Sequence, residues 1–313
     1  MESAENFSKD EWLKLELLRE RFLAAQPESH SYWGSLQDLE LYDRSFARRI
    51  SWKIEAVVDE LIRLQALPDE FELVDFACGS GAMAETFAKS FSDRIKSITL
   101  YDHSSLAMEF SKAKLRRLHP QLSVDSIEKV SSVRPNSFIV ASHVVGELSE
   151  ESLRTFTQLL RGSAGFVLIE AGTPVHSAKL VQLRETLRRD GFSISAPCPH
   201  QDKCPMLNSD KDWCHNFAAV PSEVFQTPFW AEFSKRLKID LRVLPYSYLS
   251  MSKASSPQPV ESRQVGRARV YKGFVRSLWC DQSGQLEELE HSKKANAKLY
   301  KSLKKNPNQV FPE

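Results

Sequence analysis

The stretch VDFACGSGAMAE, residues 74–85, joins a short apolar run to a helical pattern through a turn with two glycines. Asp75 lies near the end of the expected strand, and Gly79, Ser80 and Gly81 lie where the helix opens. Glycine lets the backbone approach a ligand closely, and a helix N-terminus offers free amide groups. The stretch therefore predicts a strand, a ligand-binding turn and a helix in an α/β sheet.

The sequence on both sides of this turn alternates between apolar runs and helical patterns. Expected strands at 72–77, 97–102, 137–142 and 165–172 are separated or followed by expected helices at 82–91, 104–118, 149–161 and 176–190. Such alternation is typical of a parallel sheet covered by helices on both faces, with right-handed crossovers. We therefore predict a doubly wound α/β sheet, preceded by an N-terminal helical region with helices at 9–27 and 46–66.

A second acidic residue, Asp102, ends the second expected strand, twenty-three residues after Gly79. An acid near this position holds ribose hydroxyls in nucleotide-binding sheets. A dinucleotide site would carry a third glycine where this chain has Ala84. The form D-x-x-x-G-x-G instead resembles motif I of S-adenosylmethionine-dependent methyltransferases, although a glycine turn of another nucleotide-binding domain is the alternative. The predicted donor-binding residues are Asp75, Gly79, Ser80, Gly81 and Asp102.

Candidate catalytic residues follow the expected strands at 137–142 and 165–172, which we number the fourth and fifth strands of the sheet. His143 and Glu147 follow the fourth strand, and Glu170 ends the fifth. Ligands bind over the carboxyl ends of such strands, but capping and packing would explain these residues equally well. There is no Asn/Asp-Pro-Pro-aromatic stretch for a base nitrogen and no cysteine on the fourth strand for a pyrimidine ring. The sequence therefore identifies no catalytic residue, and whether methyl transfer occurs stays open.

Bulk properties exclude several classes of protein. A chain of 313 residues with 42% hydrophobic residues can bury a full core, which excludes a disordered tail. No run approaches the ~18 consecutive apolar residues that a membrane helix needs. The start MESAENFSKDEW has neither the apolar core of a signal peptide nor the arginines of a transit peptide. We therefore expect a cytoplasmic protein that makes no membrane contact.

Three of the five cysteines lie within the stretch APCPHQDKCPMLNSDKDWCH, residues 196–215. An odd number of cysteines in a reducing compartment argues against a disulfide framework. Four thiolates, those of Cys198, Cys204, Cys214 and the later Cys280, would suit an iron–sulfur cluster. Zinc could use the same sulfurs, or His200 or His215 in place of one of them. Buried thiols without a metal are the remaining alternative.

The C-terminal part of the chain is basic. From residue 250 onward there are twelve Lys and Arg residues against six Asp and Glu. No acid lies between residues 262 and 280, and the expected helix near the end carries lysines at 294, 298, 301 and 305, along one stripe. A solvated surface or an anionic partner would explain this charge, and we take RNA as the expected partner. The candidate RNA-binding residues are Arg263, Arg267, Arg269, Lys272 and Arg276.

The order of these motifs resembles one family. The pattern CPHxxxCP followed by WCH stands downstream of a methyltransferase-type sheet, with ELS after the fourth strand and EAGTP at the fifth. It is similar to the methyltransferase-like assembly factors of the mitochondrial small ribosomal subunit, which include methyltransferase-like protein seventeen, and to their bacterial relatives. The resemblance covers residues 40–280. Two departures are CGSG in place of G-x-G-P-G, and a stretch after WCH that is less basic than in the family.

The resemblance implies a Rossmann-like class I methyltransferase sheet, S-adenosylmethionine binding and association with small-subunit ribosomal RNA during assembly. It also implies a [4Fe–4S] cluster whose ligands would be Cys198, Cys204, Cys214 and Cys280. We expect a monomer off the ribosome, either an assembly protein with weak or lost activity or an active rRNA methyltransferase. The alternative is a small-molecule methyltransferase with a structural metal site.

The expected domains follow from these motifs. An N-terminal helical region is followed by an S-adenosylmethionine-binding core, a cysteine-rich metal-binding insertion with a late strand, basic strands carrying the fourth cysteine, and a basic C-terminal helix or tail. Their boundaries are 1–70, 71–192, 193–252, 253–284 and 285–313.

Overall fold

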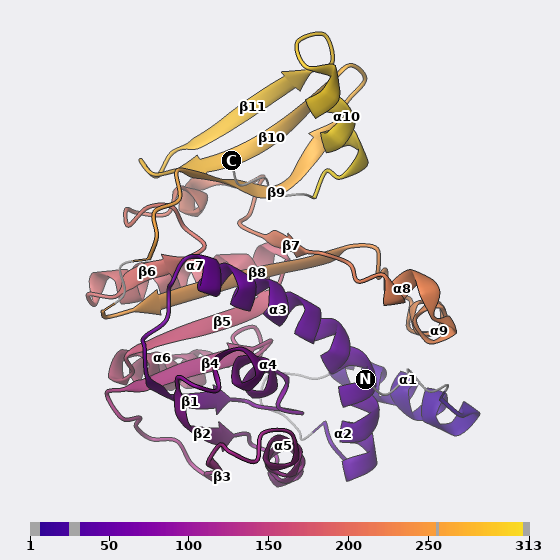
Figure 1. Ribbon diagram of the computed structural model, residues 1–313, viewed down its shortest axis with the longest axis vertical. Coiled ribbons are helices and arrows are strands. Elements are labelled where there is room, and N and C mark those ends of the chain that lie inside the picture. The colour runs from indigo at the N-terminus through magenta and orange to yellow at the C-terminus, as the bar shows by residue number, and fades with distance from the viewer. Residues whose placement is uncertain (1–6, 25–31, 255–256, 309–313) are drawn as a thin grey trace. The chain divides into compact units, whose positions relative to one another are not determined.

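The computed structural model describes residues 7–24, 32–254 and 257–308 (Figure 1). The chain forms two compact units, each built from several segments. The first unit comprises residues 1–59, 68–164 and 218–244, and the second comprises residues 60–67, 165–217 and 245–313. Within the described residues, no helix combines the length and the apolar character needed to cross a membrane.

The first unit contains a parallel sheet in the order β3-β2-β1-β4. Its inward side chains, including Phe71, Leu73 and Phe138, are fully buried, as expected for strands covered by helices. Three of the four strands were predicted, but β3 was missed because three residues carry too little pattern. The strands are β1 (Phe71–Phe76), β2 (Ile95–Tyr101), β3 (Val124–Ser126) and β4 (Ser137–Ser142).

Helices follow the strands of the first unit, each within two residues of its predicted bounds. Serine caps begin two of them, because the hydroxyl of Ser104 accepts from the amide of Ala107 and that of Ser149 from the amide of Ser152. The helices are α4 (Ala82–Phe91), α5 (Ser105–Leu118) and α6 (Glu150–Gly162). The alternation of strand and helix confirms the Rossmann-like fold.

The N-terminal helical region contains more helical segments than the two that we predicted. Its elements are α1 (Lys9–Ala24), α2 (Leu36–Tyr42), η1 (Asp43–Ala47) and α3 (Arg48–Arg63). The predicted helix 9–27 is observed up to Ala24, and its last three residues lie outside the described residues. The short helices α8 (Glu223–Gln226) and α9 (Pro228–Leu237) also belong to this unit. Trp12 and Phe229 stack with ring centroids 5.4 Å apart, which packs α9 against α1.

The second unit departs from the all-parallel sheet that we predicted. The strand β8 (Leu244–Ser252) lies between β5 (Gly165–Ala171) and β6 (Ser193–Ala196) and runs antiparallel to both. The short strand β7 (Asn216–Ala218) also pairs with β8. The helix α7 (Pro174–Arg189) follows β5, and the short helix η2 (Pro205–Asn208) follows in the cysteine-rich stretch. Nearly every residue of β8 is buried, so its apolar run did not reveal its direction.

A second, three-stranded antiparallel sheet completes the second unit. It consists of β9 (Ser262–Val270), β10 (Phe274–Asp281) and β11 (Leu286–Ser292), in the order β11-β10-β9. The helix α10 (Ala297–Lys305) packs against this sheet, because Tyr300 and Leu303 form a core with Ala268 and Val275. The strand β11 was not predicted, since residues 285–313 were assigned to a helix or tail.

Candidate functional site

The turn between β1 and α4 has the left-handed backbone that its glycines predict. Gly79 has φ of +50° and Gly81 has φ of +77°. A Cβ atom at Gly81 would lie 3.1 Å from the Cβ atom of Ser111, so the turn also packs tightly against α5. The amide of Gly81 donates to the carbonyl of Cys78 at 2.7 Å. Cys78, in the same turn, is buried.

Asp102 connects this turn to the loop after β2. Its buried carboxylate accepts from the amides of Gly79 and Ser104, each at 2.9 Å. Two carboxylate oxygens have about four lone-pair sites, so each oxygen can accept a further hydrogen bond from a ligand. The structure therefore brings Gly79 and Asp102 together at the ends of adjacent strands.

Asp75 and Ser80, the other two predicted donor-binding residues beside the glycines and Asp102, contact the protein itself. The fully buried carboxyl of Asp75 accepts from the amide of Ala84 at 3.1 Å, inside the first turn of α4. Burial raises the pKa of Asp75 to about 7. The carbonyl of Ser80 accepts from Lys114, whose ammonium pairs with Asp43 at 2.6 Å. Both residues therefore stabilise the turn through contacts within the protein.

The turn opens on a cavity of about 210 Å³ in the first unit. The N-terminal helices supply aromatic side chains to its wall, and the strand ends supply polar ones. A second cavity of about 320 Å³ shares part of this wall, including Tyr32, Ala77, His103 and Glu147. Carboxylates and aromatic faces together attract a cation. The aromatic residues of the first cavity are Phe22, Tyr32, Trp33, Tyr42 and Phe46.

Two of the three candidate catalytic residues line this cavity. His143 has φ of +56°, a conformation that is strained for a residue with a side chain. Glu147 lies at the exposed mouth and accepts from the hydroxyl of Tyr32 at 3.0 Å. Desolvation by the surrounding protein raises the pKa of Glu147, and burial raises that of Tyr32 to about 12. Glu170 belongs to the second unit, where its buried carboxylate lies 4.0 Å from Nε2 of His176.

The four predicted metal-ligating cysteines share one neighbourhood in the second unit. Cys198, Cys204 and Cys214 line one small cavity. The thiol of Cys280, on β10, interacts electrostatically with those of the other three. These interactions place Cys280 near the cysteine-rich stretch, although the two are far apart in the sequence.

The backbone around these cysteines is held by hydrogen bonds. The carbonyl of Cys214 accepts from the hydroxyls of Ser177 at 2.8 Å and Ser247 at 2.9 Å. The amide of Cys204 donates to the carboxylate of Glu185 at 3.1 Å. Cys280 is paired on both sides, within the three-stranded sheet. Each thiol therefore projects from an anchored segment.

Burial raises the pKa values of Cys204, Cys214 and Cys280. It raises the pKa of Cys204 to about 11 and that of Cys280 to about 12, and neighbouring cysteines add to both effects. One cation faces the group, because Nε of the buried Arg184 lies 3.3 Å from Sγ of Cys198 as a hydrogen-bond donor. A guanidinium at this position would stabilise a thiolate.

The two histidines named as alternative ligands differ in their surroundings. Both ring nitrogens of the buried His200 lack a hydrogen-bond partner among the described residues. His215 instead donates from Nδ1 to the carbonyl of Trp213 at 2.9 Å and stacks on its indole ring. Across the described ranges, no three His, Cys, Asp or Glu side chains are placed to hold one metal ion. The residues fit a thiolate-bound group chemically, but the metal-binding insertion that we predicted stays a prediction.

The candidate RNA-binding residues divide into paired and unpaired side chains. Arg263 has 11% of its side chain exposed, pairs with Glu60 and donates to the hydroxyl of Tyr248. Its guanidinium therefore stabilises the interior and is not part of an exposed cationic surface. Arg269 pairs with Asp212, and Arg276 pairs with Glu290 at 3.1 Å. Within the described part of the chain, Arg267 and Lys272 make no ion pair and are exposed.

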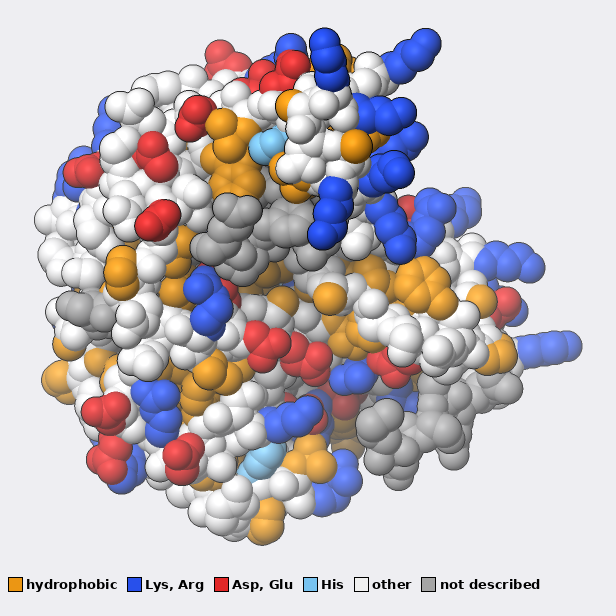
Figure 2. All heavy atoms as spheres, turned by 45° about the horizontal axis from the view of Figure 1, so that its top comes forward, with side chains coloured by type: hydrophobic (Ala, Val, Ile, Leu, Met, Phe, Trp, Pro, Cys, Tyr) orange, Lys and Arg blue, Asp and Glu red, His pale blue; other side chains and the backbone are white. Residues whose placement is uncertain are grey.

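Acids from elsewhere in the fold thus neutralise part of the charge that looked uncompensated in the sequence. The acidic strand β11 pairs with β10 and supplies Glu288 and Glu290, which face Arg276. On the face shown in Figure 2, Lys and Arg side chains still gather along the right of the upper half. The cationic surface is therefore smaller than its residue count predicts.

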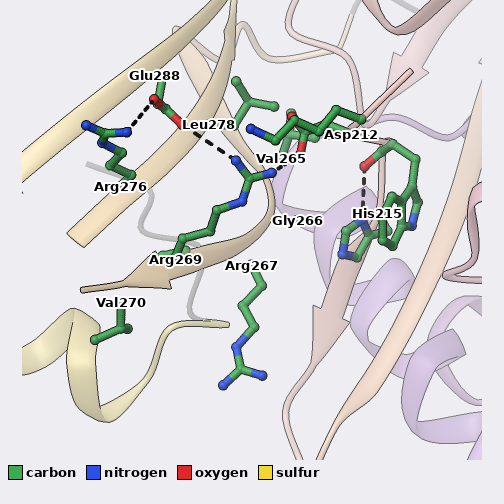
Figure 3. Close-up of a pocket in the computed structure, with 13 residues that line it drawn as sticks. Asp212, His215, Val265, Gly266, Arg267, Arg269, Val270, Arg276, Leu278 and Glu288 are labelled. Atoms are coloured by element: carbon green, nitrogen blue, oxygen red, sulfur yellow. Dashed lines mark hydrogen bonds and ion pairs between the residues drawn. The ribbon is translucent and has the colours of Figure 1, made fainter. Parts of the chain in front are cut away.

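Arg267, Arg269 and Arg276 line a cavity of about 530 Å³ in the second unit (Figure 3). Trp213 and His215 form part of the same wall. Sequence reasoning did not connect this aromatic pair with the arginines, because they are about fifty residues apart in the chain.

Solved structures with a similar fold are methyltransferases of low sequence identity. A magnesium protoporphyrin IX methyltransferase from Synechocystis, with bound S-adenosylmethionine, is 13% identical over 80% of this chain and 100% of its own, with a TM-score of 0.43. A putative RNA methyltransferase from Pyrococcus horikoshii is 12% identical over 79% and 98%, with a TM-score of 0.39. A putative methyltransferase from Bacillus halodurans is 14% identical over 64% and 100%, with a TM-score of 0.38. No curated protein matches this chain.

A family model matches a stretch of the chain that overlaps most of the resemblance and extends beyond its C-terminal end. The match begins in the N-terminal helices and continues past Cys280 into α10. The resemblance predicted from the sequence is thereby confirmed: the chain belongs to the family described as mitochondrial small ribosomal subunit Rsm22, whose model matches residues 47–307.

Proposed function

We propose that this chain is a methyltransferase-like factor of the small ribosomal subunit that binds S-adenosylmethionine, a [4Fe–4S] cluster and ribosomal RNA. The observation that carries the proposal is the Asp102 carboxylate, held by the Gly79 amide at the wall of a cavity rich in aromatic rings. Membership of a family named for the small ribosomal subunit supports the RNA partner.

The first-unit cavity suits the methyl donor chemically. The free lone pairs of Asp102 would accept the ribose hydroxyls, as acids at this position do in Rossmann-like sheets. S-adenosylmethionine supplies an activated methyl group on a cationic sulfonium when it is bound. Tyr42 and Phe46 would present their rings, and Glu147 its carboxylate, to that positive charge.

Among the described residues, Tyr32 is not placed as a catalytic base. The hydroxyl of Tyr32 already donates to Glu147, and the raised pKa of Tyr32 keeps it protonated at neutral pH. Methyl transfer to an acceptor that is already nucleophilic would need only proximity and orientation. We therefore propose donor and RNA binding as the principal function, with methylation weak or absent.

The second unit would hold the cluster on Cys198, Cys204, Cys214 and Cys280. The shared neighbourhood of the four thiols, the unpartnered nitrogens of His200 and the donor from Arg184 support this assignment. A cluster there would connect the cysteine-rich stretch to β10, so its binding free energy would contribute to the folding of this unit.

Calorimetric titration of S-adenosylmethionine tests the donor site. We expect saturable binding that weakens at least ~10-fold in Asp102→Asn, since the amide replaces one acceptor oxygen by a donor. The matched control is Asp59→Asn, which removes an exposed carboxylate of the same unit and should leave the affinity unchanged. Wild-type affinity in Asp102→Asn would remove Asp102 from the site.

Co-sedimentation with small-subunit ribosomal RNA tests the partner. Binding should fall steeply as salt is raised, because contacts to phosphates release counterions. Absence of co-sedimentation at low salt would contradict the RNA part of the proposal.

A further inference from the structure

The second-unit cavity of Figure 3 combines a fixed aromatic pair with free cations. Its volume of about 530 Å³ lies in the range of sites for small ligands. The wall comes from residues 211–215 on one side and from β9, β10 and β11 on the other. Every lining residue belongs to the second unit.

The aromatic pair is locked in place by the protein itself. The rings of Trp213 and His215 stack with centroids 4.7 Å apart and an interplanar angle of 17°. The indole Nε1 donates to the carbonyl of Gly172 at 3.0 Å, and Nδ1 of His215 donates to the carbonyl of Trp213. A Cβ atom at Gly266 would come within 2.5 Å of the His215 ring, so the backbone of β9 lies directly against it. The pair is thus a rigid flat wall before any ligand arrives.

The charges of the cavity separate into an internal network and free cations. Four cations, from Lys211 and three arginines, face two carboxylates, from Asp212 and Glu288, which leaves two positive charges. Figure 3 shows Arg269 and Arg276 both directed toward Glu288, at 3.6 and 3.8 Å.

The two remaining cations are available to a ligand. Arg267 points away from the network around Glu288 in Figure 3. Within the described residues, neither Arg267 nor Lys211 makes an ion pair, and both are exposed. A rigid ring wall beside unpaired cations matches the two parts of a nucleotide, the base and its phosphate.

We propose that this cavity binds one unpaired nucleotide of single-stranded RNA, with its base against the Trp213–His215 pair and its phosphate at Arg267 and Lys211. The inference rests on the proposed function and specifies which form of RNA the protein recognises. A base within a duplex is stacked on its neighbours, so only a base out of the stack can reach a protein ring. Stacking tolerates every base, so the site should read the absence of pairing rather than sequence.

Fluorescence anisotropy with labelled RNA probes tests the proposal. The probes are single-stranded oligoadenylate, an RNA duplex of the same length, and an abasic ribose–phosphate strand with the same charge. Wild-type protein should bind the oligoadenylate about 10-fold more tightly than the abasic strand, because stacking contributes roughly 1–3 kcal/mol per base. Equal affinity for the two single strands would overturn the proposal.

Two variants separate the base from the phosphate. Trp213→Leu should remove the preference for bases, while Trp213→Phe should retain part of it. Arg267→Gln, on an exposed and unpaired side chain, should weaken both single strands and lower the salt slope by about one. Lys203→Gln makes the same charge change on an exposed residue outside the cavity and should leave binding unchanged. Circular dichroism identifies variants that fold.

The outcomes distinguish this inference from the proposed function. A folded Trp213→Leu protein that binds small-subunit RNA and oligoadenylate as the wild type does would overturn the nucleotide site and leave the proposed function standing. Wild-type protein that binds no RNA would overturn both.

Discussion

Two sites of the molecule are stabilised in different ways. The donor cavity is the first-unit cavity beside Gly79 and Asp102 that we propose for S-adenosylmethionine, and the cysteine group consists of Cys198, Cys204, Cys214 and Cys280 of the second unit. Around the donor cavity, the carboxylate of Asp102 accepts hydrogen bonds from the amides of Gly79 and Ser104, which lie 23 and 2 residues away in the sequence. In the cysteine group, by contrast, burial raises the pKa of Cys204 to about 11 and that of Cys280 to about 12, and His200 has no hydrogen-bond partner among the described residues. The carboxylate of Asp102 is therefore positioned by backbone amides before any ligand binds, whereas the imidazole of His200 is buried without such partners among the described residues.

The largest effect should come from removing one cysteine of the second unit. We expect anaerobically purified wild-type protein to be brown, and Cys204→Ser to lose the colour and much of the stability of this unit. The free energy of metal binding at structural sites, on the order of 10 kcal/mol, is also free energy of folding. Visible absorbance, iron content and hydrogen exchange in peptides of each unit measure the two effects.

Cys78→Ser is the matched control, because Cys78 is equally buried but belongs to the first unit. It should keep the colour and leave exchange in the second unit unchanged. Colourless wild-type protein with stoichiometric zinc would overturn the cluster, and equal losses in both variants would remove the difference between the two sites.

A second, smaller effect should separate two arginines that the sequence analysis grouped together. Arg263→Gln removes one of the two arginines that pair with Glu60, so we expect a loss of about 1–3 kcal/mol in the free energy of unfolding. Arg267→Gln, on an exposed and unpaired side chain, should change it by less than about 0.5 kcal/mol. Urea unfolding of the two variants measures the contrast, and similar losses would show that Arg263 is not structural.

These two arginines show where sequence reasoning reached its limit. The strands β1, β2, β4 and β5 and the glycine turn after β1 were predicted correctly, because they depend on local patterns within supersecondary units. The acids that pair with Arg263 and Arg276 could not be assigned, because Glu60 and Glu290 approach only once distant strands and helices have packed. Linear charge counts therefore overestimated the cationic surface.

The wall of the donor cavity was missed for the same reason. Tyr32, Trp33 and Tyr42 come from an N-terminal region that we expected only to precede the sheet. The density of aromatic residues between 32 and 46 was the available signal, because so many large rings need a common packing partner. The direction of β8 carried no such signal, since a strand buried on both faces reads the same in either direction.

A third effect concerns pH and the first unit. Asp75 has a pKa of about 7 in the folded chain, well above the ordinary value of 3.8. Between these two pH values the folded state holds a proton that the unfolded state has lost, so the free energy of unfolding falls by a few kcal/mol as pH rises. Asp75→Asn keeps an acceptor for the amide of Ala84 and cannot ionise, so its stability should fall less over this range.

Urea unfolding at several pH values checks this prediction, with Asp59→Asn as the exposed control of the same unit. The control should follow the wild-type curve. If Asp75→Asn also followed that curve, the carboxyl would have an ordinary pKa, and the donor turn would not contain a buried acid that opposes folding.

The smallest effect distinguishes the two glycines of the donor turn. Both have positive φ, so an alanine at either position should cost about 1–2 kcal/mol from backbone strain alone. Gly81→Ala should cost more than Gly79→Ala, because a new Cβ meets Ser111 at 3.1 Å, whereas nothing lies within 4 Å at Gly79. Thermal unfolding of the two variants measures the difference. If Gly79→Ala were the more costly, the bond from the Gly79 amide to Asp102, rather than packing against α5, would hold the donor turn in place.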